Sequence, residues 1–309
     1  MVNFRKIIII HKAAIGDSVL ATPVFKALKT KKPDLKLLYI GQTQINEFFR
    51  NTCEYLDDYC DINQGFFKVR KFILLNNPDL IIDLTNNFKT NLLTLGFKKS
   101  KYKKNPKIHA VNNFFETIDK INEITGLNDL KPDFPTLNPP KSETVSDNLP
   151  MIALVIGVGK KRSNRSWPLN KWLELIEKLK PHYKVVVIGG SDEIDLSSNF
   201  REDLNLKNFI GKLSLTQTAS LLKECKVLIS SDTGPLHIAV SVGTRVIGLY
   251  GPTLVERSGP FLNEKNCIST SDICKCINLK ACSVKLYNGN SQCMDKIAVS
   301  DILNKINNI

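Results

Sequence analysis

The stretch KVLISSDTGPLHIAVSVGTRVIGLYG, residues 226–251, predicts the fold class of this chain. Its two ends, 226–232 and 244–251, are short apolar runs of the kind that form buried strands. The segment between them, 234–243, predicts a short helix that ends at Gly243. A strand, a helix and a second strand in succession predict a parallel strand pair joined by a helical crossover.

The same alternation runs along the whole chain. Apolar runs predict strands at residues 6–11, 35–41, 79–85, 151–159 and 184–190. Helical spacing predicts helices at residues 17–33, 43–50, 112–126, 168–182, 213–225 and 299–308, and a weaker strand and helix within 58–75. We therefore expect an α/β protein with two Rossmann-like, doubly wound parallel-sheet domains that face a central cleft.

A proline-rich segment separates the two halves. Residues 130–150 contain five prolines and little periodicity, which indicates a linker. The expected organisation is an N-terminal domain over 1–140, a linker over 141–150 and a C-terminal domain over 151–298. A final helix, 299–309, is a candidate to pack back on the N-terminal domain.

The charge balance indicates an anionic partner. The 309 residues carry 43 Lys plus Arg against 30 Asp plus Glu, a net charge of +13. This surplus favours nucleic acid, an anionic lipid surface or a phosphorylated substrate; a lysine-rich proteome is the alternative. KKSKYKKNPK, residues 98–107, holds six lysines and no acid, a composition that suits either a solvated loop or a site for phosphate or anionic head groups. Because the lysines are spread out and no recognition motif stands out, we expect no nucleic-acid partner.

Targeting and membrane insertion are not expected. No apolar run approaches the roughly 18 residues that span a bilayer. The N-terminal apolar run is only four isoleucines long, which argues against a signal peptide. A cytoplasmic protein is the expectation.

Three loops that follow predicted strands hold candidate chemistry. After 226–232, Thr233 and Gly234 open a helix whose free N–H groups suit a diphosphate, with His237 one turn on; Asp232 as a plain N-cap and His237 as a packed core residue are the alternative. GVGKKRSNRSWPLNKW, residues 157–172, crowds four basic side chains into one turn: Lys160, Lys161, Arg162 and Arg165. It suits either a phosphate clamp or a solvated loop.

Two acids also follow predicted strands. Glu193, in VIGGSDEID (187–195), is placed to accept hydrogen bonds from a ribose, although exposed acids at helix starts are common. Asp17, in AAIGDSVLATP (13–23), is either the N-cap of the next helix or a catalytic group at the end of the first strand. His11, at the end of that strand, is expected to be a packed histidine.

Two motifs carry a resemblance to a known family. IGDSVLATPVFKALK (15–29) and SSDTGPLHIAVSVGTRVIGLYGPT (230–253) closely resemble the bacterial heptosyltransferases, glycosyltransferase family 9. The resemblance runs the length of the chain, and it implies the two-domain GT-B fold. It also implies an inverting transfer of heptose from ADP-heptose to the inner core of lipopolysaccharide.

The resemblance implies a role for each matching residue. Asp17 would be the general base. Arg165 matches a basic residue, often lysine, that contacts the donor phosphates, and Glu193 matches the acid that holds the donor ribose. The other implied donor-binding residues are Asp232, Thr233, Gly234 and His237, with Leu213 and Leu215 beside the adenine. Arginine in place of lysine preserves the charge and changes the geometry.

The remaining expectations concern the acceptor, metals and partners. The N-terminal domain is the acceptor side, so an anionic lipid-linked saccharide would meet Lys98, Lys99, Lys101, Lys103 and Lys104 at the cytoplasmic face of the inner membrane. No two aspartates stand two apart, as Asp-x-Asp metal sites require, so we expect no catalytic metal and no cofactor. A monomer is expected. A related glycosyltransferase with another donor or acceptor, and a non-catalytic nucleotide-binding protein, remain alternatives.

The cysteines are clustered near the C-terminus. Many members of the resembling family have a cysteine-rich insert near this position. Four thiols in a reducing compartment suit a structural zinc site, and free thiols or a disulfide are the alternative. The candidate ligands are Cys274, Cys276, Cys282 and Cys293.

Overall fold

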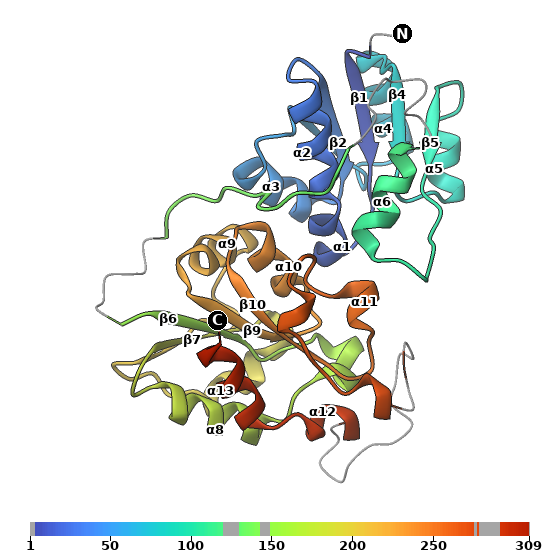
Figure 1. Cartoon of the computed structure of the whole chain (residues 1–309). Coiled ribbons are helices and arrows are strands. Elements are labelled where there is room, and N and C mark those ends of the chain that lie inside the picture. The colour runs from blue at the N-terminus through green and yellow to red at the C-terminus, as the bar shows by residue number, and fades with distance from the viewer. Residues whose placement is uncertain (1–3, 120–129, 143–148, 275–276, 278–290, 309) are drawn as a thin grey trace. The chain divides into compact units, whose positions relative to one another are not determined.

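The computed structural model describes residues 4–119, 130–142, 149–274, 277 and 291–308. The chain divides into two compact units, Met1–Pro139 and Pro140–Ile309. Each unit contains one parallel sheet with helices on both faces (Figure 1), which confirms the predicted α/β class with two doubly wound sheets. Residues 143–148, most of the predicted linker, lie outside the described residues.

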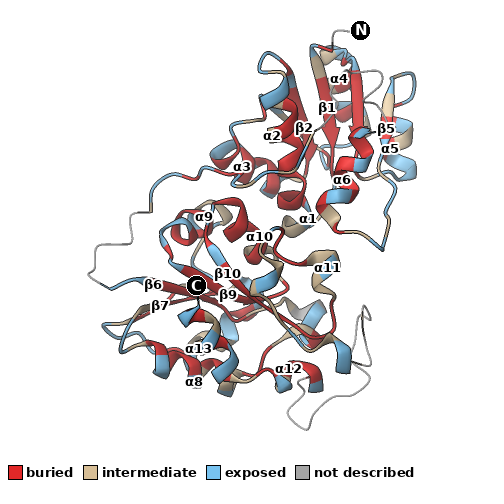
Figure 2. Ribbon diagram, in the orientation of Figure 1, coloured by how far each residue is buried: buried red, intermediate tan, exposed pale blue. Residues whose placement is uncertain are grey.

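The first unit has a sheet in the order β3-β2-β1-β4-β5. Its strands are β1 (Lys6–Ile10), β2 (Lys36–Gly41), β3 (Asp58–Asp61), β4 (Leu80–Asp83) and β5 (Lys99–Lys101). Its helices are α1 (Ile15–Leu20), α2 (Thr22–Lys31), α3 (Thr43–Thr52), α4 (Phe66–Asn76), α5 (Phe88–Leu93) and α6 (Ala110–Asp119). β1 and β2 are buried on both faces, as their unbroken apolar runs predict (Figure 2).

Side chains that alternate along the strands meet different helices. Ile8, Ile10 and Ile40 pack with residues of α4 and α5. On the opposite face, Tyr39 makes edge-on ring contacts with Phe25 of α2 and Phe49 of α3. The two faces of the sheet therefore carry different helix layers.

The second unit has a sheet in the order β11-β10-β9-β6-β7-β8. Its strands are β6 (Met151–Val155), β7 (Lys184–Ile188), β8 (Leu206–Asn208), β9 (Val227–Ser231), β10 (Arg245–Tyr250) and β11 (Ile268–Ser269). Its α-helices are α8 (Leu169–Leu179), α9 (Leu215–Glu224), α10 (Gly234–Ser241), α11 (Val255–Ser258), α12 (Gln292–Lys296) and α13 (Val299–Asn307). Short 3-10 helices are η1 (Lys160–Arg165), η2 (Ser191–Asn199), η3 (Glu264–Asn266) and η4 (Ser271–Ile273).

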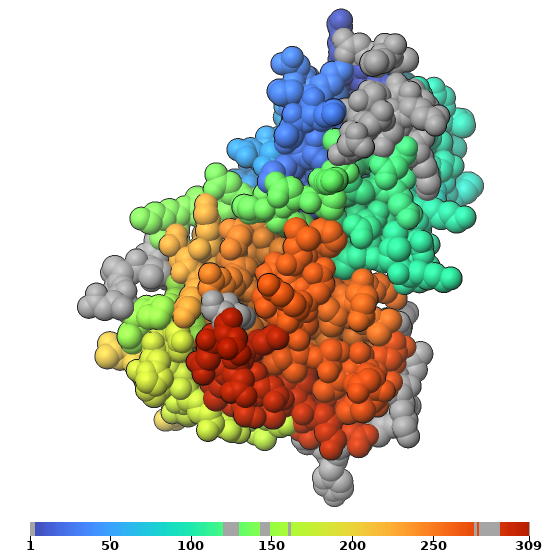
Figure 3. All heavy atoms as spheres, in the orientation of Figure 1, coloured from blue at the N-terminus to red at the C-terminus, as the bar shows by residue number. Residues whose placement is uncertain are grey.

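The expected helix over residues 17–33 is corrected. Residues 17–33 form two helices, α1 and α2, because Pro23 in the first turn of α2 has no N–H to continue the α1 ladder. The final helix, α13, buries Val299, Ile302 and Ile306 in the core of the second unit and contacts α8. Figure 3 shows the C-terminal segment, in red, against the yellow-green part of the same unit. The packing of α13 on the N-terminal domain stays a prediction.

A pair of tryptophans anchors the second core. The Trp167 and Trp172 rings pack edge to face, with centroids 4.8 Å apart, and Trp167 Nε1 donates to the carbonyl of Ile297 at 3.1 Å. Within the described residues, no helix has both the length and the apolar character to cross a bilayer.

Candidate active site

Each sheet reverses its strand order next to its first strand. In the first unit this point lies between β1 and β4, and in the second it lies between β6 and β9. In doubly wound sheets, ligands bind outside the carboxyl ends of the strands at this switch point. The loops after β1 and β4 and the loops after β6 and β9 are therefore the places where binding groups are expected.

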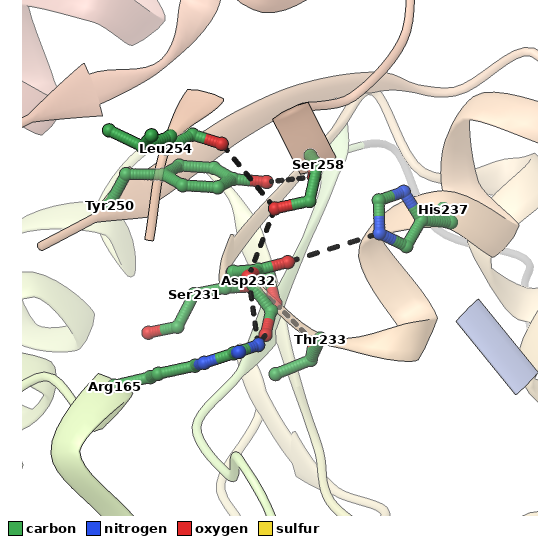
Figure 4. A network of polar contacts seen from close by, with 9 residues as sticks. Arg165, Ser231, Asp232, Thr233, His237, Tyr250, Leu254 and Ser258 are labelled. Atoms are coloured by element: carbon green, nitrogen blue, oxygen red, sulfur yellow. Dashed lines mark hydrogen bonds and ion pairs between the residues drawn. The ribbon is translucent and has the colours of Figure 1, made fainter. Parts of the chain in front are cut away.

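A buried aspartate organises the loops of the second unit (Figure 4). Asp232 directly follows β9, and its Oδ2 forms an ion pair with Arg165 Nη1 at 2.8 Å. The same Arg165 nitrogen also donates to the Asp232 carbonyl at 3.2 Å. His237 Nε2 lies 4.0 Å from the other carboxylate oxygen, Oδ1. The structure thus brings together three residues predicted from separate positions in the sequence.

The loop after β10 completes this cluster. Ser258 Oγ donates to Asp232 Oδ2 at 3.4 Å, and the Tyr250 hydroxyl donates to the Ser258 carbonyl at 2.9 Å. Burial, reinforced by the charge of Asp232, holds the pKa of Tyr250 well above its ordinary value. Tyr250 therefore remains a neutral donor.

The start of α10 lies beside the cluster. Thr233 is the N-cap residue, and its hydroxyl makes no capping bond to the helix but pairs with Ser230 Oγ at 2.9 Å. Gly234 and Pro235 form the first turn, where the helix dipole favours an anion. Pro235 has no N–H, and Leu236 N donates to the Thr233 carbonyl at 3.2 Å, which leaves Gly234 N as the backbone donor of this turn. Together with the nearby Arg165 guanidinium, this arrangement is suited to bind phosphate oxygens.

Glu193 joins two glycine-rich loops. Its Oε1 accepts from Gly159 N at 2.9 Å, and its Oε2 accepts from Gly190 N at 2.8 Å. Gly157 packs against the same side chain, because a Cβ at residue 157 would lie 2.2 Å from Glu193 Cδ. The carboxylate thus connects the loops after β6 and β7; its contact with a ribose stays a prediction.

The other predicted donor residues lie farther along the sheet. Leu213 and Leu215 are half-buried around the start of α9, which Ser214 caps by accepting from Gln217 N at 3.2 Å. Their place beside an adenine stays a prediction.

Asp17 lies in the first turn of α1. The N-cap residue is Ala14, so Asp17 does not cap the helix. Its side chain is exposed, and within the described part of the chain its carboxylate accepts no hydrogen bond and forms no ion pair. A helix N-terminus favours a negative charge at this position. The carboxylate is therefore accessible to a substrate hydroxyl.

His11 is packed, as predicted. It is 4% exposed and meets the Phe114 ring edge-on at 5.4 Å. Burial lowers the pKa of His11 to about 4, while the charge of Asp17 acts in the opposite direction. A neutral imidazole therefore lies beside the exposed carboxylate.

Asp83 is a site residue that the sequence reasoning missed. It ends β4, is fully buried, and its Oδ1 accepts from the N–H groups of Thr85 and Asn86 at 3.0 and 2.8 Å. Thr85 Oγ1 in turn accepts from Lys12 N at 2.7 Å. Asp83 thus fixes the loop that holds the segment leading to Asp17. The sequence signal that could have identified Asp83 is an acidic residue at the end of the apolar run in the predicted strand 79–85.

The candidate acceptor lysines are not equivalent. Lys99 lies in the edge strand β5, and its Nζ donates to Thr94 Oγ1 at 3.0 Å; burial lowers its pKa. Lys98 lies over the Phe4 ring at 5.2 Å. Lys101, Lys103 and Lys104 are exposed. Part of the predicted basic loop is therefore a strand, and its role in acceptor binding stays a prediction.

The structure describes two of the four candidate zinc ligands, Cys274 and Cys293. Cys276 and Cys282 lie outside the described residues. Cys274 and Cys293 carry no disulfide bond within the described residues, and burial, together with the neighbouring Cys274, raises the pKa of Cys293 to about 11. Within the described ranges, no group of three or more metal-ligating side chains is present. These two thiols alone do not make a metal site.

Curated relatives resemble this chain over different lengths. Lipopolysaccharide heptosyltransferase 2 of Escherichia coli K12 is 26% identical over 132 residues, which are 40% of this chain and 38% of that protein. The chain thus aligns with about two fifths of the first curated relatives. Lipooligosaccharide heptosyltransferase 2 of Campylobacter jejuni subsp. jejuni is 20% identical over 314 residues, 96% of this chain and 95% of that protein.

The fold agrees with a solved structure. E. coli ADP-heptose lipopolysaccharide heptosyltransferase II superposes with a TM-score of 0.76 at 18% identity, over 98% of each chain. The family model of glycosyltransferase family 9 (heptosyltransferase) matches residues 66–288. Because this match spans more than two thirds of the chain, including the Asp232 and α10 segment, the chain belongs to glycosyltransferase family 9, the heptosyltransferases.

Proposed function

We propose that this protein transfers a heptose from ADP-heptose to an inner-core lipopolysaccharide acceptor with inversion of configuration. The assignment of the donor-binding site rests on the Arg165–Asp232 pair. This pair lies beside the start of α10, at the switch point of the second sheet. Family membership and the fold shared with E. coli ADP-heptose lipopolysaccharide heptosyltransferase II support ADP-heptose as the donor.

The donor site would act through charge. The diphosphate of ADP carries negative charge that increases as the bond from the anomeric carbon to the phosphate oxygen breaks. Arg165 and the backbone N–H at the start of α10 are fixed in place before the reaction, so they stabilise this charge without reorganising. Asp232 orients Arg165 through the 2.8 Å contact. The diphosphate must share the guanidinium with that carboxylate.

Asp17 would act as the general base. In the transfer, an acceptor hydroxyl oxygen bonds to the anomeric carbon, ADP leaves, and the hydroxyl proton passes to a carboxylate oxygen of Asp17. The exposed carboxylate in the first turn of α1, without a protein partner in the described residues, fits this role. The proposal requires Asp17 to reach the acceptor hydroxyl while the second unit holds the donor.

The proposal also covers the acceptor, the membrane contact, the oligomeric state and the absence of a catalytic metal. The acceptor would be an anionic lipid-linked saccharide at the cytoplasmic face of the inner membrane, met by exposed lysines such as Lys101, Lys103 and Lys104. The protein would act as a monomer, without a catalytic metal.

A donor and acceptor assay tests the proposal. Thermal shifts with ADP, UDP, GDP and CDP should show strong stabilisation by ADP alone, and mass spectrometry of a truncated lipopolysaccharide acceptor should show a gain of one heptose. Asp17→Asn should lower turnover by about 10²-fold or more while ADP binding is retained. Asp34→Asn, an exposed aspartate of the same unit, is the control.

Each outcome separates the candidates. Stabilisation by another nucleotide would identify a related glycosyltransferase with a different donor. ADP binding without transfer to any saccharide would identify a nucleotide-binding protein. Wild-type turnover of the Asp17→Asn variant would remove the general-base role.

A further inference from the structure

The first unit exposes an unusual set of large apolar side chains on two neighbouring helices. On α4 these are Phe67, Leu74 and Leu75, and on and just after α5 they are Phe88, Leu92 and Leu95. Phe67 and Phe88 are each 86% exposed, and Leu75 is 75% exposed. The other exposed large apolar residues of the described chain lie in loops and 3-10 helices of the second unit. Such a gathering marks an interaction surface.

Helical spacing places these side chains on one face of α4. Phe67, Lys71 and Leu74 stand four and three residues apart and share the exposed face. Val69 and Ile73 occupy the opposite face and are fully buried in the core. The exposed apolar residues are therefore not needed to hold α4 on its sheet.

The second helix repeats the arrangement. Phe88, Leu92 and Leu95 are also spaced by four and three residues and are exposed, while Leu93 is buried in the same cluster as Val69 and Ile73. Figure 2 shows the outer side of α5 as exposed.

The two exposed faces point away from the same side of the sheet. α4 and α5 contact each other, and Arg70 Nη1 of α4 donates to the carbonyl of Leu93 at 2.6 Å. Because both helices bury their inner faces against the same sheet face, their outer faces form one surface. We call it the α4–α5 surface: Phe67, Lys68, Lys71, Leu74, Leu75, Phe88, Lys89, Leu92 and Leu95.

The surface is strongly basic. Residues 62–107 hold ten Lys or Arg and two acids, Asp79 and Asp83, and the preceding strand β3 carries Asp58 and Asp61. Asp61 accepts from Thr43 Oγ1 and Asn63 N. Asp79 accepts from the backbone N–H groups of Arg5 and Lys6, and Asp83 is fully buried, so neither acid lies among the exposed lysines. Lys68, Lys71 and Lys89 therefore lie beside exposed phenylalanine and leucine, with no acid in their own helices.

A hollow lies at the α4 edge of this surface. A cavity of about 340 Å³ is lined by Tyr59, Cys60, Gln64, Lys68, Lys71, Phe72 and Leu75. It combines two ammonium groups with apolar walls, which suits a phosphate group attached to a hydrocarbon chain.

We propose that the α4–α5 surface binds an anionic lipid bilayer. Its phenylalanine and leucine side chains would enter the boundary between head groups and acyl chains, and its lysines would contact lipid phosphates. A second copy of the chain fits poorly, because pairing this surface with itself would bring the two positive surfaces together. The inference rests on the proposed function and deepens it, since it places the expected membrane contact on α4 and α5 of the first unit, whereas the candidate donor residues belong to the second unit.

Vesicle co-sedimentation of the full chain tests this. The wild type should bind vesicles that contain phosphatidylglycerol far better than vesicles of phosphatidylcholine alone. The Phe67→Ser/Leu75→Ser/Phe88→Ser variant should bind at least tenfold more weakly, and so should Lys68→Gln/Lys71→Gln/Lys89→Gln. Leu204→Ser is the matched control, because Leu204 is 84% exposed and lies in the second unit; its binding should not change.

A failure of the membrane-binding inference can be distinguished from a failure of the proposed transferase function. All variants should keep the wild-type thermal shift with ADP, which shows that they are folded and that donor binding is intact. Unchanged vesicle binding by the triple serine variant would overturn the inference. It would also be overturned by sedimentation velocity if the wild type is a dimer that the serine variant converts to a monomer, since the surface would then be a self-association face.

Discussion

Gly157→Ala should destabilise the second unit through Glu193 alone. Gly157 does not have a positive φ, so alanine suits its backbone, and the penalty comes from the new methyl group. That carbon would lie 2.2 Å from Glu193 Cδ and 2.5 Å from Oε1. The Glu193 side chain must therefore move, and it loses its bonds to Gly159 N and Gly190 N.

The expected cost follows from those two bonds. A hydrogen bond to a charged group contributes about 1.5–3 kcal/mol, so two fully buried bonds would contribute roughly twice that. Gly159 is only half-buried and Gly190 is exposed, so water can replace Glu193 at both N–H groups. We therefore expect a loss of about 2–3 kcal/mol in the free energy of unfolding for Gly157→Ala. A similar loss is expected for Glu193→Ala.

A double-mutant cycle measures this coupling. Tryptophan fluorescence during urea unfolding reports the second unit, because the chain has two tryptophans, Trp167 and Trp172, and both lie in its core. In the Glu193→Ala background the methyl group has space, so Gly157→Ala should cost less than about 0.5 kcal/mol there. An equal cost with and without Glu193 would refute the reasoning. The same variants should bind ADP more weakly, since the loops after β6 and β7 lose their connection.

Three further predictions concern charge and metal. Arg165→Gln should weaken ADP binding about tenfold or more, measured by calorimetry, whereas Arg165→Lys should retain most of the affinity; equal losses would contradict a charge-based role. The pKa of His11 is lowered to about 4 in the folded chain. Between about pH 6.5 and pH 4, His11 therefore binds a proton in the unfolded state but not in the folded state. Stability from this group is therefore present above about pH 6.5 and falls by about 3 kcal/mol as the pH drops to 4. In calorimetric unfolding of the first unit, His11→Gln should flatten this dependence, and an unchanged slope would exclude His11 as its cause. If the cysteines bind structural zinc, purified protein should contain one zinc per chain by mass spectrometry, and Cys293→Ser should release it; metal-free wild type would favour free thiols.

Local sequence patterns predicted the two sheets and the turns that hold the candidate site residues. Continuous apolar runs such as 6–11 and 184–190 form strands because buried parallel strands need apolar side chains on both faces. The helix starts after strands could also be predicted, since Gly234, Pro235 and Ser214 have local backbone and capping roles. Each of these signals depends on neighbours within a few residues.

Tertiary structure decided the contacts between distant loops. Arg165 meets Asp232, and Glu193 lies against Gly157, only because the order β9-β6-β7 brings three strand ends to one edge. Lys99 donates to Thr94 because it joins the edge of the first sheet, and the apolar face of α13 packs in the second core. The sequence by itself determined which segments form strands, helices and anion-binding turns. Strand order determined which of those turns meet, because parallel pairing is chosen by contacts between residues far apart in the chain.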